Sequence, residues 1–273
     1  MPPKSLWSST SQIDSTKARE MAEYFESRSR YKDQKKVNYA LKDLLNPKNG
    51  ERFLDVGCGT GILTRLIASN LFPNGSITGI DISTHFVEIA RNSVQDLKYG
   101  SIIKFDIGDA EHLPYSDQYF DTAFATRLLL YIHNPQQAVK EIKRVVKENG
   151  TIVLADWDFD TLVVDHSNRL ITRKIIHWRT DNKDGNNWSG RQLFRFLKEQ
   201  DLKDIVIKPV ITFAIDEDNS LTQSIFNAAS GALKANIITE IQYESWISEL
   251  KKRLQEGTFF ASIIYYLVKG IKA

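Results

Sequence analysis

The stretch Leu54-Asp55-Val56-Gly57-Cys58-Gly59-Thr60-Gly61 decides the fold of this chain. Its first residues are typical of the end of a buried strand, and its glycines form a loop before a helical pattern of apolar residues. Such a loop exposes bare backbone, and the helix that follows presents unpaired N–H groups and a partial positive charge. The sequence therefore predicts a site here for a small, partly anionic ligand.

Two later segments repeat the pattern of a strand that ends at a carboxylate. Residues 76–81 end at Asp81, and residues 102–105 lead to Asp109. An acidic residue at this distance behind a glycine loop suits a βαβ unit whose carboxylate accepts hydrogen bonds from ribose hydroxyls. Because ligands of open α/β sheets lie outside the carboxyl ends of the strands, Asp55, Asp81 and Asp109 are candidate site residues.

Each carboxylate also has a purely structural interpretation. Asp81 is placed to cap the helix that starts near Ser83, and Asp109 is a common type of turn residue. Asp55 is placed to fix the glycine loop by accepting backbone N–H bonds. The strand context and the spacing favour the ribose role for Asp81.

The main alternative for the glycine loop is a nicotinamide dinucleotide site. Its fingerprint, G-x-G-x-x-G, fits Gly57 and Gly59 but requires a third glycine at the position of Ile62, whereas the glycine here is Gly61. The loop also has no basic residue to meet a pyrophosphate. The pattern therefore favours an amino-acid carboxylate at the helix N-terminus.

The apolar periodicity alternates between strand and helix along the chain. After a helical pattern in two pieces over about 16–45, the expected elements are 51–56, 61–71, 76–81, 84–97, 101–106, 121–126, 135–147 and 151–156. This alternation predicts an α/β fold with a doubly wound, mostly parallel sheet. Beyond Asp156 we expect a helical stretch over 167–180, a loop over 181–187 and a helix that ends near Gln200. A strand over 204–215, helices over 217–256 and a last strand over 258–271 follow.

The ordered motifs resemble those of class I S-adenosylmethionine-dependent methyltransferases of the small-molecule type, such as those of ubiquinone and menaquinone biosynthesis. Residues 54–61 match the family's first motif, Asp81 its ribose-binding acid, and Asp109-Ala110 the pair beside the adenine. Residues 144–150 resemble the turn before the fifth strand, with Glu148 and Asn149 replacing a proline and a glycine. Since asparagine tolerates left-handed backbone geometry, we expect this turn to form.

The resemblance implies a seven-stranded, Rossmann-like methyltransferase fold that binds S-adenosylmethionine and releases S-adenosylhomocysteine. It also implies an N-terminal helical lid over 1–45, and a methyltransferase domain over 46–273 with a helical substrate cap formed by insertions at about 157–200 and 217–256. Ile82 and Ala110 are expected to line the adenine ring. The implied cofactor-binding residues are Asp55, Gly57, Cys58, Gly59, Gly61, Asp81, Ile82, Asp109, Ala110, Thr126, Arg127 and Tyr31.

The substrate side is less specific. Trp157 and Asp158 follow the fifth expected strand, Trp188 lies in the cap and Tyr24 in the lid, so these four are candidate substrate contacts, with core packing the alternative for Trp157. The candidate catalytic bases are His166, His177 and Asp158, although structural histidines are common.

Composition narrows the function classes. The chain has 273 residues, 42% of them hydrophobic, with a net charge of +2, which gives no electrostatic case for a nucleic-acid partner. The chain has a single cysteine, Cys58, so it cannot form an internal disulfide, which fits a reducing, cytoplasmic location. We interpret Cys58 as a small residue packed under a cofactor rather than as a nucleophile. No metal-ligand spacing is visible, and the longest apolar stretch, 259–268, is short of the ~20 residues of a membrane span.

These observations together favour methyl transfer to an O, N or C atom of a small, partly apolar metabolite. Two alternatives remain from the sequence. In the first, the chain binds S-adenosylmethionine without transferring its methyl group and has a regulatory or different chemical role. In the second, which its charge favours less, the chain is an RNA or protein methyltransferase.

Overall fold

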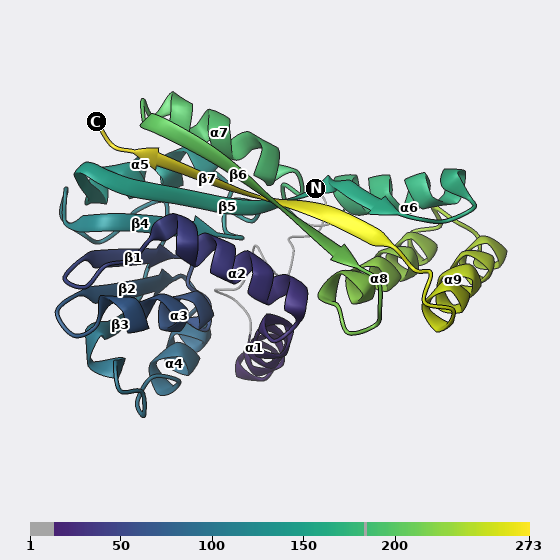
Figure 1. Ribbon diagram of the computed structural model, residues 1–273, viewed down its shortest axis with the longest axis horizontal. Helices are drawn as coiled ribbons and strands as arrows, with labels where there is room; N and C mark the ends of the chain where they lie inside the picture. The colour runs from purple at the N-terminus through teal and green to yellow at the C-terminus, as the bar shows by residue number, and fades with distance from the viewer. Residues whose placement is uncertain (1–13, 183–184) are drawn as a thin grey trace.

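The computed structural model describes residues 14–182 and 185–273. Within them, one seven-stranded sheet has the order β3-β2-β1-β4-β5-β7-β6 (Figure 1). Strands β1 to β5 pair in parallel, and β7 is antiparallel to both of its neighbours. The strands are β1 (Arg52–Val56), β2 (Ser76–Asp81), β3 (Ile103–Ile107), β4 (Phe120–Thr126), β5 (Val146–Val164), β6 (Lys203–Ala214) and β7 (Ala261–Ile271).

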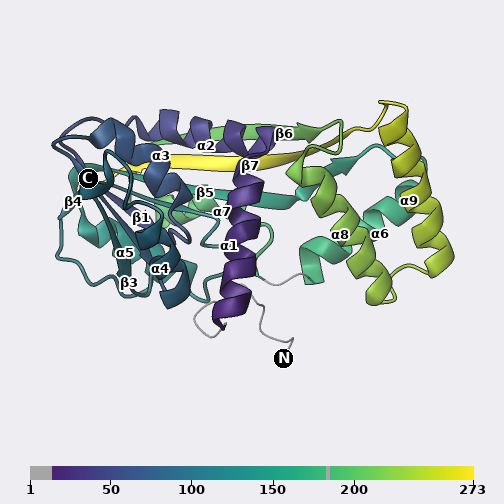
Figure 2. The same ribbon diagram turned by 90° about the horizontal axis from the view of Figure 1, so that it is seen from below.

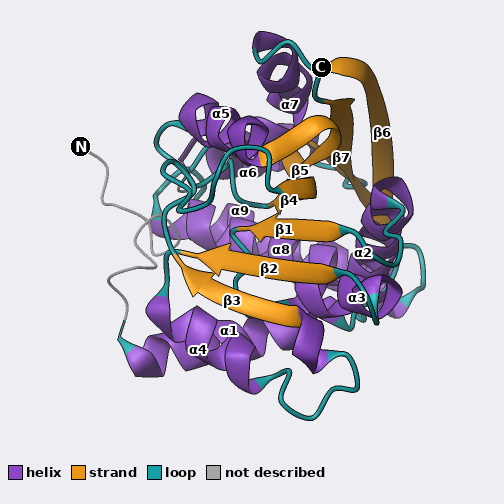
Figure 3. Cartoon of the chain, turned by 90° about the vertical axis from the view of Figure 1, so that its left-hand side faces the viewer, coloured by secondary structure: helices purple, strands orange, loops and turns teal. Residues whose placement is uncertain are grey.

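Helices cover both faces of this sheet. They are α1 (Ser15–Ser29), α2 (Lys32–Leu45), α3 (Ile62–Leu71), α4 (Thr84–Asn92), α5 (Pro135–Val145), α6 (Arg169–Asn182), α7 (Ser189–Glu199), α8 (Ser220–Lys234) and α9 (Glu240–Gln255). Figure 3 shows α5 and α7 on one side of the strands and α2 and α3 on another. In β1, Phe53 packs into the cluster that contains α2 and α3, whereas Leu54 packs into the cluster that contains α5 and α7. The predicted doubly wound α/β fold is therefore confirmed.

Local sequence explains where several of these elements begin. Asn134 caps α5, its side chain accepting from the Gln137 N–H at 3.1 Å, and Pro135 occupies the first helical position. The side chain of Ser83, and not that of Asp81, caps α4. Asn149 has φ +61°, so the turn before the central part of β5 forms with asparagine where the family motif has glycine.

The structure corrects the expected start of the cap. Strand β5 does not stop at Asp156 but continues to Val164, where it still pairs with β7. Residues 157–164 are therefore part of the sheet, and the helical part of that insertion begins at α6. Together, β5, β6 and β7 extend beyond the other strands to a cluster of α6, α8 and α9, and α1 lies between that cluster and the rest of the sheet (Figures 1 and 2).

Residues 1–13, which belong to the expected lid, lie outside the described residues. In the described ranges, no helix combines the length and the apolar character needed to cross a membrane.

Candidate active site

The glycine loop after β1 has the backbone geometry that its sequence predicts. Gly57, Gly59 and Gly61 all have positive φ, at +74°, +53° and +78°. The N–H groups of Gly57 and Cys58 both donate to the Ile80 carbonyl of β2, at 2.8 and 3.0 Å. A Cβ on Gly59 would meet no atom within 4 Å, so open space lies next to this backbone. The loop is therefore anchored to β2 and leaves room for a ligand.

Asp81, at the end of β2, is held in place by backbone donors. Its carboxylate accepts from the Gly59 N–H at 2.8 Å and from the Ser83 N–H at 2.9 Å. Burial raises the pKa of Asp81, and these hydrogen bonds oppose that shift. At the end of β3, Asp109 accepts from the Glu111 N–H at 2.9 Å. The two carboxylates are thus fixed at the carboxyl edge of the sheet.

Asp55 is buried beneath the loop. It accepts a 2.6 Å hydrogen bond from the Thr64 hydroxyl of α3, and burial raises its pKa to about 7 despite that bond. Asp55 therefore ties β1 to α3 through hydrogen bonds from both the side chain and the backbone N–H of Thr64.

Cys58 has the surroundings of a packed side chain. A Cβ on Gly79 of β2 would lie 2.9 Å from the Cys58 sulfur, so the glycine loop can approach β2 this closely only because residue 79 is glycine. Burial raises the pKa of the Cys58 thiol well above its usual range. A thiol with a raised pKa is a poor nucleophile, in agreement with a packing role.

Arg127 follows β4 in an unusual backbone conformation, with φ +53°. Its guanidinium donates to the side chains of Gln34 at 2.9 Å and Asn38 at 3.4 Å, both on α2. Its backbone N–H donates to the Ala155 carbonyl of β5 at 2.9 Å. These neutral partners hold the guanidinium without neutralising it, and its charge remains available to a ligand.

Apart from Asp55 and Gly61, these groups line one large cavity of about 1050 Å³. From the sheet edge and glycine loop it is lined by Gly57, Cys58, Gly59, Asp81, Ile82, Asp109, Ala110, Thr126 and Arg127. From α1 and α2 it is lined by Tyr24, Phe25, Arg28, Asp33, Gln34 and Asn38. From the extended strands and the cap it is lined by Trp157, Phe159, Arg179, Asn186, Asn187, Ser220, Leu221, Ser224, Asn227 and Ile263.

The cavity has two chemically different halves. The half at the glycine loop carries the carboxylates of Asp81 and Asp109, and beside them Ile82 is 46% exposed despite its apolar side chain. The half under the cap has an aromatic wall in which Trp157 stacks with Phe159 at 6.2 Å between ring centroids. A cofactor and an acceptor can therefore meet in one cavity.

A profile of the methyltransferase domain family matches residues 47–229. The chain belongs to the methyltransferase domain family. This membership confirms the resemblance drawn from the motifs, and the seven-stranded sheet agrees with it.

Two curated relatives illustrate the similarity. An uncharacterised 37.1 kDa protein in transposon TN4556 of Streptomyces fradiae is 29% identical over 84% of this chain and 64% of its own length. The demethylmenaquinone methyltransferase of Lactobacillus johnsonii is 35% identical over 40% of this chain and 44% of its own length. Each match thus spans less than two thirds of the relative.

A solved structure supports the fold. Phosphoethanolamine N-methyltransferase 2 of Haemonchus contortus, in complex with S-adenosyl-L-methionine, superposes with a TM-score of 0.54 at 17% identity. The alignment covers 86% of this chain and 52% of that one.

Several residues proposed for the site do not line the cavity. Among the expected cofactor residues these are Asp55, Gly61 and Tyr31, and among the others Asp158, Trp188, His166 and His177. Asp158 is buried in an ion pair with Arg191 of α7, at 2.5 Å. Gly61 supports the site from outside, since a Cβ there would lie 2.6 Å from the Phe105 ring.

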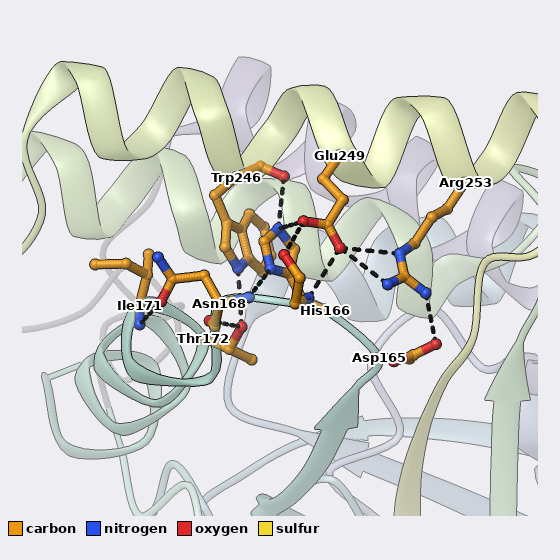
Figure 4. Close-up of polar contacts among 9 residues, drawn as sticks. Asp165, His166, Asn168, Ile171, Thr172, Trp246, Glu249 and Arg253 are labelled. Carbon is orange, nitrogen blue, oxygen red and sulfur yellow. Dashed lines mark hydrogen bonds and ion pairs between the residues drawn. The ribbon is translucent and has the colours of Figure 1, made fainter.

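His166 belongs to a separate network between the cap helices (Figure 4). Its ring stacks on Trp246 at 5.1 Å, its Nε2 lies 3.2 Å from the Trp246 carbonyl, and its Nδ1 accepts from the Asn168 N–H. Burial lowers the pKa of His166. With both ring nitrogens engaged in this network, the structure does not support its expected role as a base.

Sequence reasoning missed Gln34, Asn38 and Arg179 as cavity residues. Polar residues on α2 carry no strand-end or glycine-loop signal, so Gln34 and Asn38 are not visible as partners of Arg127. For Arg179 a signal existed. It lies four residues after Ile175 and eight after Ile171, on the buried face of α6, where a charge is unusual.

Proposed function

We propose that this chain transfers a methyl group from S-adenosylmethionine to an O, N or C atom of a small, partly apolar acceptor. The observation that carries the proposal is the single cavity that joins the glycine loop to an aromatic-lined cap. Family membership and the demethylmenaquinone methyltransferase among the relatives support a small-molecule acceptor. The complex of the structural neighbour with S-adenosyl-L-methionine supports the cofactor.

The residues of the glycine-loop half fit this cofactor. Asp81 would accept hydrogen bonds from the ribose hydroxyls, and the exposed apolar surface of Ile82, with Ala110, would contact the adenine ring. The methionine carboxylate would meet the N-terminus of α3 and the guanidinium of Arg127, which has only neutral partners among the described side chains.

The cofactor supplies an activated methyl group on a sulfonium with a neutral leaving group. The contribution of the chain is then to hold the acceptor atom in line with that methyl group and to exclude water. Trp157 and Phe159 provide a rigid apolar surface for this alignment, because Trp157 also packs edge-on against Tyr265 at 4.6 Å.

The first test is calorimetric titration with S-adenosylmethionine, S-adenosylhomocysteine and NAD. We expect micromolar binding of the first two and no binding of NAD. Asp81→Ala should weaken the binding at least tenfold, since one charge-assisted pair of hydrogen bonds is lost. Asp96→Ala, at an exposed position, is the matched control and should bind as the wild type does.

The second step is an acceptor screen that detects the mass gain of one methyl group. Binding of NAD in place of the sulfonium cofactor, or equal binding by Asp81→Ala, would contradict the proposal. Cofactor binding without methylation of any acceptor in a broad screen would favour a non-methylating role.

A further inference from the structure

Arg179 is a buried cation in the cap half of the cavity. It lies on α6, lines the cavity and is 4% exposed. Its guanidinium carbon is 3.6 Å from the centroid of the Phe159 ring, and its Nη2 donates to the Ser224 hydroxyl of α8 at 3.2 Å. A ring face and a neutral hydroxyl both favour a guanidinium, but neither carries an opposite charge.

Among the described residues, no carboxylate lies within ion-pair distance of Arg179. The Nη1 atom of Arg179 is buried and has no hydrogen-bond partner among the residues that the structure describes. Burial lowers the pKa of Arg179 to about 10, which still leaves it charged at neutral pH. A buried charge without a counter-charge is costly, and buried charges in folded proteins are normally paired.

The surroundings of Arg179 add positive charge to the cavity. Arg28 and Arg127 line the same cavity. Burial raises the pKa of Tyr131 to about 12, and the positive charges of Arg28, Arg179 and Arg127 oppose that shift. The carboxylate of Asp33, from α2, also lines the cavity, but it accepts from the Ser220 hydroxyl and the Gln34 amide. Both partners are neutral, so Asp33 keeps its negative charge, but among the described residues it forms no ion pair with Arg179.

A second unsatisfied group lies in the wall. The Asn186 Oδ1 is buried without a partner among the described residues, and Asn186 lines the cavity together with Arg179. Two incompletely satisfied polar side chains in one wall indicate that a polar ligand group belongs there, because native interiors pair nearly all such atoms.

We propose that the methyl acceptor carries an anionic group, a carboxylate or a phosphate ester, that binds Arg179 in the cap half of the cavity. This inference rests on the proposed function, since it assigns the glycine-loop half to the cofactor and the cap half to the acceptor. The guanidinium offers planar, paired donors that match both kinds of anion, and the Ser224 hydroxyl lies beside it. The adjacent Phe159 and Trp157 rings receive the apolar part of the same molecule.

The test uses three probes that share one ring: benzoate, phenyl phosphate and the neutral benzamide. Each is titrated into protein saturated with S-adenosylhomocysteine, with calorimetry and the intrinsic tryptophan fluorescence, to which Trp157 in the cavity wall contributes, as readouts. At least one anion should bind ten or more times tighter than benzamide. The stronger of the two anions identifies the acceptor group as a carboxylate or a phosphate ester.

The variants locate the binding site. Arg179→Gln should lower the affinity for the preferred anion at least tenfold and leave the affinity for S-adenosylhomocysteine within twofold. Arg173→Gln, an exposed arginine on the same helix, should change neither. Retained S-adenosylhomocysteine binding also shows that the variant is folded, and the comparison of anions with benzamide in the wild type needs no variant.

Three results would overturn the inference: benzamide binding as tightly as both anions, no binding of either anion, or equal effects of Arg179→Gln and Arg173→Gln. Each is distinct from failure of the proposed function, which would appear as absence of S-adenosylhomocysteine binding in the first titration.

Discussion

At the scale of single residues, the carboxylates at the strand ends divide into two kinds. Asp55 is buried and satisfied by the Thr64 hydroxyl, so it stabilises the turn from β1 into α3. Asp81 and Asp109 line the cavity and use backbone N–H groups of neighbouring residues to fix their orientation. The same residue type in the same strand-end position therefore supports the glycine loop in one case and lines the cavity in the others.

Glu249 of α9 gives a prediction at this scale. Although burial acts in the opposite direction, hydrogen bonds from Ser167 and Arg253 hold its pKa at about 2 (Figure 4). A depressed folded-state pKa contributes stability that is fully present above the ordinary glutamate value and is lost as the pH falls toward 2. We expect Glu249→Gln to lower the free energy of unfolding by about 1–2 kcal/mol at pH 7.

The difference between the wild type and Glu249→Gln should shrink as the pH falls from about 4.5 toward 2, which urea unfolding at several pH values would measure. Glu244→Gln, at an exposed position of the same helix, is the control and should have no such effect. A difference that stays constant with pH would show that the Glu249 charge does not stabilise the cap.

At the scale of elements, the cap depends on the close approach of α6 and α8. A Cβ at Gly231 of α8 would lie 2.2 Å from the Trp178 ring of α6. In an open helix, replacing glycine by alanine stabilises by about 0.5–1 kcal/mol, but overpacking costs about 1–3 kcal/mol. Because Trp178 is next to Arg179, any shift of α6 also moves the charge that lines the cavity.

We therefore expect Gly231→Ala to lower the free energy of unfolding by about 1–2 kcal/mol and to leave binding of S-adenosylhomocysteine nearly unchanged. Chemical denaturation and calorimetry measure the two quantities. Gln223→Ala, at an exposed position of α8, should be nearly neutral. A more stable Gly231→Ala protein would mean that α6 and α8 separate easily.

The elements also explain which parts of the molecule the sequence predicts. The alternating elements and the glycine loop are local patterns, so the parallel half of the sheet and the placement of Asp81 and Asp109 followed from them. The cap half was not predictable in the same way. Trp157 was expected there, but Gln34, Asn38 and Arg179 reach the cavity only through the packing of α2 and α6 against distant strands. Likewise, the 157–164 segment is a strand because β7 lies beside it.

At the scale of the whole molecule, the cavity is lined by three parts that are far apart in the sequence. These are helices α1 and α2, the glycine loop with its strand ends, and the cap. Helix α1 is linked to the glycine loop through Glu26, which pairs with Arg65 at 2.7 Å and accepts from the Thr60 hydroxyl at 3.2 Å. The position of α1 and the conformation of the loop are therefore coupled, and a ligand at the loop should stabilise both.

This coupling predicts that Glu26→Gln weakens binding of S-adenosylhomocysteine about three- to tenfold, although Glu26 does not line the cavity. Hydrogen exchange of α1 should slow when the wild type is saturated with S-adenosylhomocysteine. A ligand at about 100 times its Kd stabilises the folded protein against unfolding by about 2.7 kcal/mol. In Glu26→Gln this protection of α1 should be smaller, whereas Glu23→Gln, at an exposed position of α1, should behave as the wild type does. Equal protection of α1 in all three proteins would mean that the helix closes over the cavity independently of the glycine loop.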